Sequence, residues 1–300
     1  MTIRSRQLHD SSLVGVRDMQ CRPESLACGC EECSSRHVLV FPRRGAFVLH
    51  EGSQSAVMDS SHVGFFTADR PRRVSHLETG GDDCTAVTYA DEILDEAAAA
   101  AGVPAAERRR RPFPVVKAPL DAAAVLKSQI FFGDLVRDDA SALKAEERAM
   151  DLLREAFAAM PRWVEEPVRP RNAKRLRNIV LAAQEWIAAR PFENWSLGDL
   201  ARDVGSSPYH LLRQFRAETG STIHQYRTQL RLAAAARMIL EGCDDLTALA
   251  LDLGFSSHSH FSDAFRRRFG MAPSALRRGA GRAQRAQLRK NSTAPWSAAE

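Results

Sequence analysis

The chain has 300 residues, of which 44% are hydrophobic and 26% are charged, with a formal net charge of +5. At roughly 100–200 residues per domain, this length predicts two domains of mixed α and β structure. No apolar run reaches the ~18 residues of a membrane span, and the N-terminus lacks the apolar stretch of a secretion signal. We therefore expect a cytoplasmic protein without a membrane partner, whose cysteines stay reduced.

The charge is unevenly distributed along the chain. Residues 171–290 contain 20 Lys and Arg against 10 Asp and Glu, whereas residues 1–170 contain 22 against 26. A basic domain beside a mildly acidic one is typical of proteins that face DNA, because neutralising phosphates releases counterions and provides affinity. A solvated basic surface without a partner gives the same counts, so the charge alone leaves both interpretations open.

A Cys-rich segment, residues 1–34, comes first in the chain. Its four cysteines follow the pattern C-x6-C-x-C-x2-C and are Cys21, Cys28, Cys30 and Cys33. Four thiolates satisfy a tetrahedral zinc site, which makes zinc the candidate cofactor. A thiol switch for an oxidant, an electrophile or a soft metal ion is the second hypothesis, and incidental surface cysteines are the third. The isolated Cys84 and Cys243 are predicted to be packed as small hydrophobes.

Residues 35–118 are expected to form the first folded domain. Between His37 and Ala90, short β-rich runs alternate with turn residues; the runs are HVLVF, GAFVLH, SAVMD, HVGFF and CTAVTYA. This pattern predicts a small antiparallel barrel or sandwich. Residues 91–102 then favour a helix, and residues 107–119, with their arginines and prolines, favour a linker or an exposed crossing.

A helical connector is predicted over residues 119–166. Apolar residues recur there at helical spacing, first Val125, Leu126, Ile130 and Leu135, then Leu143, Met150, Leu153 and Phe157. Two amphipathic helices account for this spacing. Their apolar stripes can pack on the β domain or on a second subunit, so we expect this region to serve a homodimer. Prolines at 161, 167 and 170 mark the boundary of the basic domain.

The strongest signal is an internal repeat with a period of about 50 residues. One copy, LGDLARDVGSSPYHLLRQFRAETG, runs from Leu197 to Gly220, and the other, LTALALDLGFSSHSHFSDAFRRRFG, runs from Leu246 to Gly270. In each copy a short helix ends at a glycine, and a serine, Ser207 or Ser257, then caps a second helix. This order is typical of a helix-turn-helix unit.

The spacing within each second helix separates inward from outward residues. Leu211 with Phe215, and Phe261 with Phe265, lie four residues apart and are predicted to face the core. Between the copies, residues 222–241 predict one helix of about 20 residues, roughly 30 Å long. That length matches the ~34 Å between successive major-groove faces, so one chain can present both second helices to one face of DNA.

Residues 172–279 resemble the DNA-binding domain of the AraC/XylS family of transcription regulators. The resemblance is carried by S-P-x-x-L-x-R-x-F from Ser207, by Y-x4-R-L-x2-A from Tyr226 to Ala235, and by GFSSxSHFSxAFRRRFGMAPSALR from Gly254. It implies an all-α domain with two helix-turn-helix units and double-stranded promoter DNA as partner. It further implies base contacts by Tyr209, Leu212, Arg213, His258, Ser259, Ser262 and Asp263.

The outward arginines complete the predicted DNA surface. Arg213 can donate a bidentate pair to guanine, and Tyr209 and Leu212 can contact a thymine methyl group. Leu212 and Asp263 depart from the polar or basic residues that the family often has at these positions. Phosphate contacts, which set register without reading sequence, are predicted for Arg216, Arg227, Arg266, Arg267 and Arg268. For Asp263, an ion pair with Arg267 is an equal alternative to a base contact.

Residues 35–118 resemble, less specifically, the cupin-like sensing domain that often precedes this DNA-binding domain. The resemblance rests on RRGAFVLHEG from Arg43, on MDSSHVGFFTADRPRRVSH from Met58 and on GGDDCT from Gly80. It implies an α+β chain in which a cupin-like antiparallel β domain senses an effector and a helical connector leads to the all-α domain. The histidines of a cupin metal site lie close together, whereas His50, His62 and His76 are scattered, so we expect no catalytic site.

The sequence thus predicts a DNA-binding transcription regulator, an activator that works with RNA polymerase, whose N-terminal domain senses a small molecule, a metal or a thiol-reactive signal. The alternative is a cupin-type or thiol-dependent enzyme fused to a DNA-targeting domain. A nonspecific nucleic-acid scaffold is the third possibility, which footprinting would distinguish by its diffuse coverage. The basic tail, residues 280–300, lacks a core pattern and is predicted to be disordered.

Overall fold

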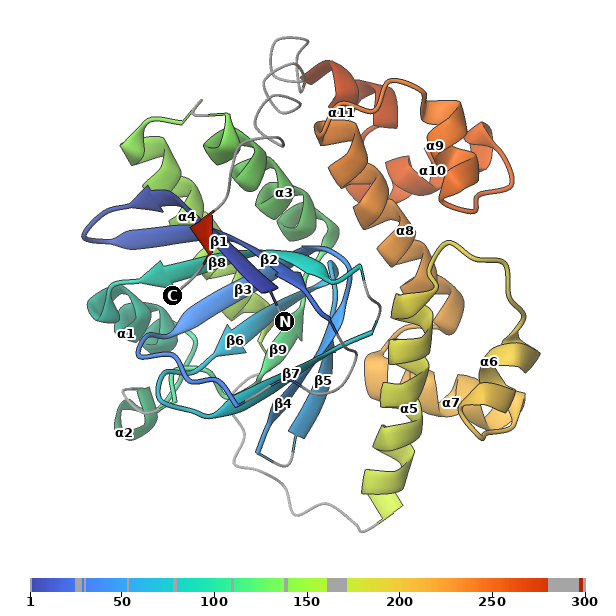
Figure 1. Ribbon diagram of the computed structural model, residues 1–300, viewed down its shortest axis with the longest axis horizontal. Helices are drawn as coiled ribbons and strands as arrows, with labels where there is room; N and C mark the ends of the chain where they lie inside the picture. The colour runs from blue at the N-terminus through green and yellow to red at the C-terminus, as the bar shows by residue number, and fades with distance from the viewer. Residues whose placement is uncertain are drawn as a thin grey trace.

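The computed structural model describes residues 2–24, 29, 31–52, 54–77, 80–108, 111–137, 140–160, 172–279 and 297–298. Two antiparallel sheets form its N-terminal half, and helices follow (Figure 1). This arrangement confirms the predicted α+β class. Within these ranges, no helix combines the length and the apolar character that crossing a bilayer requires.

The larger sheet contains seven strands within the described ranges, each antiparallel to its neighbours. In spatial order they are β10 (Ser297–Ala298), β1 (Thr2–Asp10), β2 (Val14–Arg22), β8 (Asp82–Tyr89), β3 (Val38–Arg44), β6 (His62–Phe66) and β9 (Lys117–Pro119). β1 and β2 lie in the segment that the sequence analysis set apart as Cys-rich. The sheet therefore begins at Thr2, because β1 pairs with β2 from Thr2 onward and β2 pairs in turn with β8 from Val14 to Cys21.

The smaller sheet places β4 (Phe47–Glu51) between β5 (Gln54–Met58) and β7 (Arg72–His76). β7 escaped the sequence analysis because RRVSH has no apolar alternation. An isolated bridge between Glu32 and Arg72 brings the end of the Cys-rich segment alongside this strand. Two segments that are distant in the sequence, around Glu32 and around Arg72, thus lie side by side at the edge of the smaller sheet.

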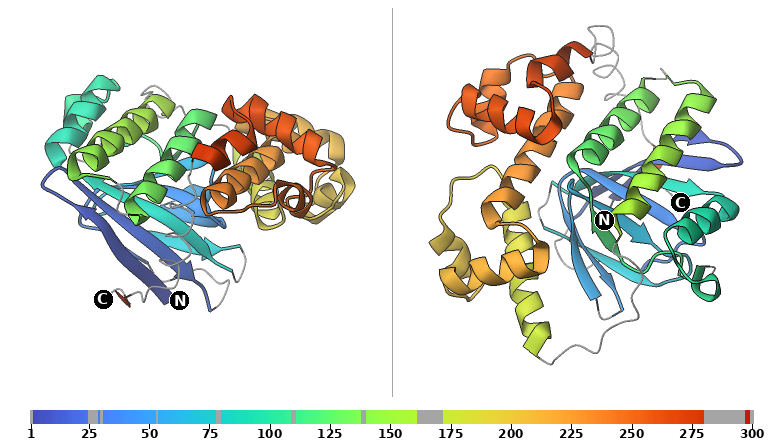
Figure 2. Two further views of the ribbon diagram at one scale, coloured as in Figure 1. Left: turned by 90° about the horizontal axis from the view of Figure 1, so that it is seen from above. Right: turned by 180° about the vertical axis from the view of Figure 1, so that it is seen from behind.

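The strands of the larger sheet send alternate side chains to opposite faces. In β3, Leu39 and Phe41 join a core with the helices, whereas Val40 joins a second core with the smaller sheet. The helices on the first face are α1 (Asp91–Ala100), α3 (Ala122–Val136) and α4 (Ala142–Ala159), as Figure 2 shows. The short α2 (Ala105–Arg108) and β9 lie in or beside the stretch expected to be a linker.

The two predicted connector helices are present as α3 and α4. Most of their apolar stripe is buried, but Leu143 is 66% exposed and does not pack on the β domain. Leu126 of α3 packs into the core of the C-terminal domain, together with Leu232 and Phe265. α3 is therefore covered on one side by the sheet and on another by helices of the same chain.

Seven helices of the described ranges make up the C-terminal domain. They are α5 (Asn172–Ala189), α6 (Leu197–Asp203), α7 (Pro208–Thr219), α8 (Ile223–Leu240), α9 (Leu246–Asp252), α10 (His258–Phe269) and α11 (Pro273–Gly279). α8 begins after the cap Thr222 and ends at the cap Glu241, which confirms the predicted helix over 222–241. Its 18 residues span roughly 27 Å at 1.5 Å per residue.

Most of the predicted tail, residues 280–296 and 299–300, lies outside the described residues. Ser297 and Ala298 form β10, which pairs with Ser5 and Arg4 at the edge of the larger sheet. The expectation of disorder is therefore wrong for Ser297 and Ala298 and stays a prediction for residues 280–296 and 299–300.

Candidate DNA interface and candidate ligand sites

Each repeat folds as a helix-turn-helix unit with the predicted caps. The hydroxyl of Ser207 accepts a hydrogen bond from the backbone N–H of His210, and that of Ser257 accepts one from His260. Both second helices end at a glycine in the left-handed conformation, Gly220 and Gly270, each with φ of 71°. A side chain at such a position would strain the backbone, so the glycines mark where α7 and α10 end. The serine caps mark where the two helices begin.

α7 exposes the three base-contacting residues predicted for the first unit. Tyr209 is 76% exposed, Leu212 is 42% exposed, and Arg213 is also exposed. On the opposite face Leu211 and Phe215 are fully buried. Two large apolar side chains thus flank an arginine on one solvent face, an arrangement suited to the methyl groups and acceptor atoms of a major groove.

α10 presents a more polar face. The residues predicted to contact bases on this helix are His258, Ser259, Ser262 and Asp263, of which Ser262 is half-buried and the others are exposed. His258 Nε2 lies 3.5 Å from Ser262 Oγ, and Phe261 and Phe265 are fully buried beneath them. Within the described residues, Asp263 forms no ion pair with Arg267, so its carboxylate stays exposed on this face.

The five arginines predicted to hold phosphates differ in their surroundings. Arg216, Arg266 and Arg267 are exposed. Arg227 donates from Nε to the Pro191 carbonyl oxygen at 3.1 Å and lies over the Trp195 ring. Arg268 is half-buried; burial lowers its pKa, and the Asp121 carboxylate acts in the opposite direction. The structure therefore engages Arg227 and Arg268 within the protein and leaves the other three turned to solvent.

The two units lie at opposite ends of α8 (Figure 1). Ile223, Tyr226 and Leu230 of α8 share a core with α7, whereas Leu232 and Ile239 share a core with α9 and α10. α8 thus sets the separation of the two exposed helix faces.

A buried polar network ties the first unit to the N-terminal sheets. The carboxylate of Asp59 accepts hydrogen bonds from Tyr226 Oη at 2.6 Å, from Ser61 Oγ at 2.6 Å and from His62 Nδ1 at 2.9 Å. Burial acts to raise the pKa of Asp59, but His62, Lys117 and Ser61 together hold it below its usual value. Burial lowers the pKa of Lys117 to about 8. Sequence analysis missed this network, because Asp59 and Tyr226 are 167 residues apart.

The predicted four-cysteine cluster is only partly described. Cys28 and Cys30 lie outside the described residues, and Cys33 is exposed with a free thiol. Cys21 lies opposite Asp82 in the pairing of β2 with β8, and close to His76. The four-thiolate site therefore stays a prediction. The grouping of Cys21 with His76 and Asp82 was missed, since the three residues come from three separate strands.

The surroundings of Cys21 disfavour its thiolate. Burial, and then the charges of Asp82 and Glu32, raise the pKa of the Cys21 thiol to about 12. A low thiol pKa is the usual basis of reactivity toward oxidants and electrophiles. In the described structure Cys21 therefore lacks the electrostatic activation that the thiol-switch hypothesis requires. Cys84 is buried, as expected of a packed thiol, and donates to Asp82 Oδ2 at 3.2 Å.

A cavity of about 430 Å³ separates the two sheets and lies within the size range of small-molecule sites. Phe47 and Val74 of the smaller sheet and Val40 of the larger give it apolar walls. Arg17 and Arg72 supply positive charge, and Cys21, His76 and Asp82 line it as well. This mixture of apolar walls and a few polar groups is typical of a ligand pocket.

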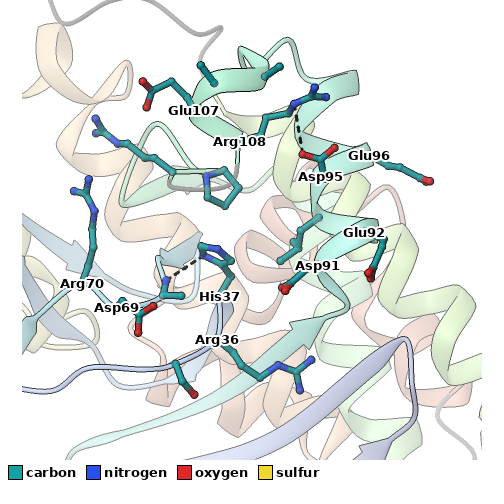
Figure 3. Close-up of a pocket in the computed structure, with 17 residues that line it drawn as sticks. Arg36, His37, Asp69, Arg70, Asp91, Glu92, Asp95, Glu96, Glu107 and Arg108 are labelled. Carbon is teal, nitrogen blue, oxygen red and sulfur yellow. Dashed lines mark hydrogen bonds and ion pairs between the residues drawn. The ribbon is translucent and has the colours of Figure 1, made fainter.

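A second, more open hollow of about 1530 Å³ lies between the start of β3, the turn at residues 68–70, and helices α1 and α2 (Figure 3). His37 accepts from the backbone N–H of Ala68 at its centre, and Arg108 pairs with Asp95 at its rim. The remaining lining is mostly charged, with both signs represented. A hollow of this kind suits water and salt better than an apolar effector.

None of the three scattered histidines shares a site with another. His50 contacts Ser55 and Ser75, His62 contacts Asp59, and His76 faces Asp82. The prediction of no catalytic site rests on this scatter and on the absence of a nucleophile motif in the sequence.

The family model and the curated relatives match the C-terminal domain. A family model described as a helix-turn-helix domain matches residues 200–279. The transcriptional regulator GlxA of Rhizobium meliloti is 36% identical over 102 residues, which cover 34% of this chain and 31% of that protein. The transcriptional activator RhaS of Pectobacterium carotovorum is 38% identical over 102 residues, covering 34% of this chain and 36% of that protein.

A solved structure of a transcriptional regulator with an AraC-type DNA-binding domain, from Chromobacterium violaceum, is 30% identical. The match covers 35% of this chain and 95% of the Chromobacterium violaceum chain, with a TM-score of 0.33. The chain spans about a third of the length of the curated relatives it matches. With its repeated units and its capped second helices, the C-terminal domain of this chain is therefore a helix-turn-helix domain that resembles those of AraC-type regulators.

Proposed function

We propose that this chain is a sequence-specific DNA-binding transcription regulator. The observation that carries the proposal is the pair of exposed faces on α7 and α10, each backed by a buried phenylalanine core and both joined by α8. A rigid helix of roughly 27 Å approaches the separation of successive major-groove faces. The exposed apolar pair on α7 and the polar face on α10 give the two grooves different chemistry.

Selection from random duplexes followed by footprinting of the full chain tests this function. We expect protection of one defined site of roughly 20 bp, covering two consecutive major grooves on one face of the duplex. A matched random duplex serves as the control. Diffuse protection without a preferred sequence would support a nonspecific scaffold instead and contradict the proposal.

The N-terminal sheets are proposed to sense an effector in the cavity between them. The hydrogen bond between Asp59 and Tyr226 supports communication with the DNA-binding units, because it joins a loop beside β6 to α8. Ala46, Val48 and Val57 extend the contact by packing in the core of the first unit. A conformational change in the smaller sheet is therefore expected to reach α8 through these packing contacts.

The Tyr226→Phe variant tests this route. Removing the hydroxyl leaves the buried Asp59 carboxylate short of a donor, which costs about 1–3 kcal/mol of stability. We expect reduced free energy of unfolding in urea for the full chain, with the exposed Tyr209→Phe as the matched control. An unchanged free energy of unfolding for Tyr226→Phe would show that the hydrogen bond does not join the two domains.

A homodimer and activation through RNA polymerase are further parts of the proposal. Because α8 and α10 contact α3, the connector can offer a second subunit mainly the outer face of α4. Sedimentation of the full chain over a range of concentrations tests the dimer. Transcription in a purified system with the selected site upstream tests activation, and a fall in transcript level would indicate repression.

A further inference from the structure

Three side chains that can ligate a metal converge between the two sheets. Cys21 lies near the end of β2, His76 ends β7 and Asp82 begins β8. A sulfur, a ring nitrogen and a carboxylate oxygen from these residues all lie within 4.8 Å of one another. Because β7 belongs to the smaller sheet and the other two strands to the larger, the group spans both sheets.

Two of these side chains are buried with polar atoms that lack a hydrogen bond. His76 is 4% exposed and Asp82 is 3% exposed. Their facing atoms, Nε2 and Oδ1, lie 3.0 Å apart, but neither atom has a hydrogen bond of good geometry. Buried polar atoms are nearly always hydrogen-bonded, whereas these two face each other only as an ion pair, which leaves both able to accept a further bonding partner. A cation between them would satisfy both at once.

The backbone around Asp82 is built to hold it opposite Cys21. Gly81 adopts a left-handed φ of 66°, and a Cβ there would lie 1.9 Å from the Cys21 carbonyl oxygen. Only glycine allows this approach of β8 to β2. Arg22 Nη1 donates to the Asp82 carbonyl oxygen at 3.1 Å, and the Cys84 thiol donates to Asp82 Oδ2, which leaves Oδ1 turned toward His76. Such outer contacts typically orient metal ligands.

We propose that Cys21, His76 and Asp82 form a binding site for a thiophilic divalent cation, with Zn²⁺ the best fit. Zinc bonds of about 2.3 Å to sulfur and 2.0–2.2 Å to nitrogen and oxygen place ligand atoms roughly 3.3–3.6 Å apart in a tetrahedron. Small side-chain rotations bring the three atoms from their present separation to that spacing. The cation displaces the thiol proton to solvent, and the thiolate and carboxylate balance its two positive charges.

This site differs from the predicted four-cysteine cluster in both ligands and consequence. It uses one thiolate instead of four, and it bridges the sheets instead of closing a loop. Binding at both sheets stabilises the folded chain, because the unfolded chain does not bring the three strands together. The proposal does not depend on the proposed regulatory function, since its test contains no DNA.

Cobalt titration of the full chain, purified metal-free under reducing conditions, tests the site. We expect one Co²⁺ per chain, visible-region bands of tetrahedral cobalt, a charge-transfer band of single-thiolate intensity, and displacement of cobalt by Zn²⁺. Cys21→Ser, His76→Gln and Asp82→Asn should each weaken binding at least tenfold. Zn²⁺ should raise the melting temperature of the wild type but not that of Cys21→Ser.

Cys33→Ser and Cys243→Ser are the matched controls, and both should bind cobalt like the wild type. Circular dichroism of each metal-free variant separates lost ligation from lost folding. The wild-type spectrum alone also decides between hypotheses: a four-thiolate charge-transfer intensity, or no cobalt binding, overturns the proposal. If folded His76→Gln or Asp82→Asn binds cobalt as tightly as the wild type, the proposed site is overturned as well. His76 and Asp82 then form an ion pair only.

Discussion

The two helix-turn-helix units share one fold but differ in chemistry and in attachment. Both have a serine cap, a left-handed glycine end and a buried phenylalanine on the second helix. The first unit exposes Tyr209 and Leu212 and packs against the smaller sheet, whereas the second exposes serines and a histidine and packs against α3. The repeat therefore conserves the scaffold, while its solvent face and its neighbours are free to diverge.

The largest expected effects come from the paired cores. Phe215→Ala and Phe265→Ala each remove a fully buried ring, so each should lower the free energy of unfolding by about 3–5 kcal/mol. Urea denaturation of the full chain measures this loss. Leu251→Ala, at a side chain that is 57% exposed, is the control and should stay within about 0.5 kcal/mol of the wild type. Equal stability of Phe215→Ala and this control would mean that the first unit lacks a specific core.

The stability of the folded chain should depend on pH through Lys117, which lowers the pKa of Asp59 in the network that attaches the first unit to the sheets. The pKa of Lys117 is about 8 in the fold, below the ordinary 10.5, so the unfolded chain binds more protons between these values. The contribution of Lys117 to stability should therefore rise with pH across this window, by up to about 3 kcal/mol, whereas the raised pKa of the Cys21 thiol acts in the opposite direction. Unfolding in urea at several pH values measures the slope.

Lys117→Met should remove that rise, because it removes the titrating group. Lys127→Met, at a lysine whose side chain is 46% exposed, should retain it. A wild-type slope in Lys117→Met would assign the pH dependence to other groups and would separate Lys117 from the Asp59 network.

Smaller losses, of DNA-binding free energy, are expected from substitutions on the exposed faces of α7 and α10, which differ in their surface chemistry. Arg213→Ala and His258→Ala should each cost ~1–3 kcal/mol on the selected site and relax specificity in their own half of it. Arg267→Ala should weaken all sequences alike, because phosphate contacts carry no sequence information. Fluorescence anisotropy on selected and random duplexes measures both. Equal losses on the two duplexes for Arg213→Ala would refute the assigned outward face of α7.

The smallest effects should be the same in both units. Ser207→Ala and Ser257→Ala each remove one cap hydrogen bond and should cost about 1 kcal/mol. Thermal melting of the full chain compares them, with Ser274→Ala as a control at a half-buried serine of α11. A cost confined to one of the caps would show that the two turns are not equivalent.

Local sequence patterns were sufficient to predict the features that depend on neighbouring residues. Caps, glycine ends and the inward spacing of Leu211 with Phe215 all involve hydrogen bonds or contacts within a few positions, so the repeat predicted the units and α8 correctly. The β-rich runs predicted β3, β4, β5, β6 and β8 for the same reason, since side-chain alternation is local. The DNA contacts predicted from resemblance remain to be tested.

Contacts between residues that are distant in the sequence could not be predicted in this way and became visible only in the fold. β1 and β7 are too polar for recognition by pattern. Strand register brings Cys21 opposite Asp82, and the packing of the two sheets brings His76 near both. The contact of Asp59 with Tyr226 likewise depends on how α8 docks on the sheets. Such pairings are set by burial and register over long loops, where many alternatives share the same local pattern. Neighbouring cysteines in the sequence therefore suggested one metal site, and the fold assembled the ligands of another.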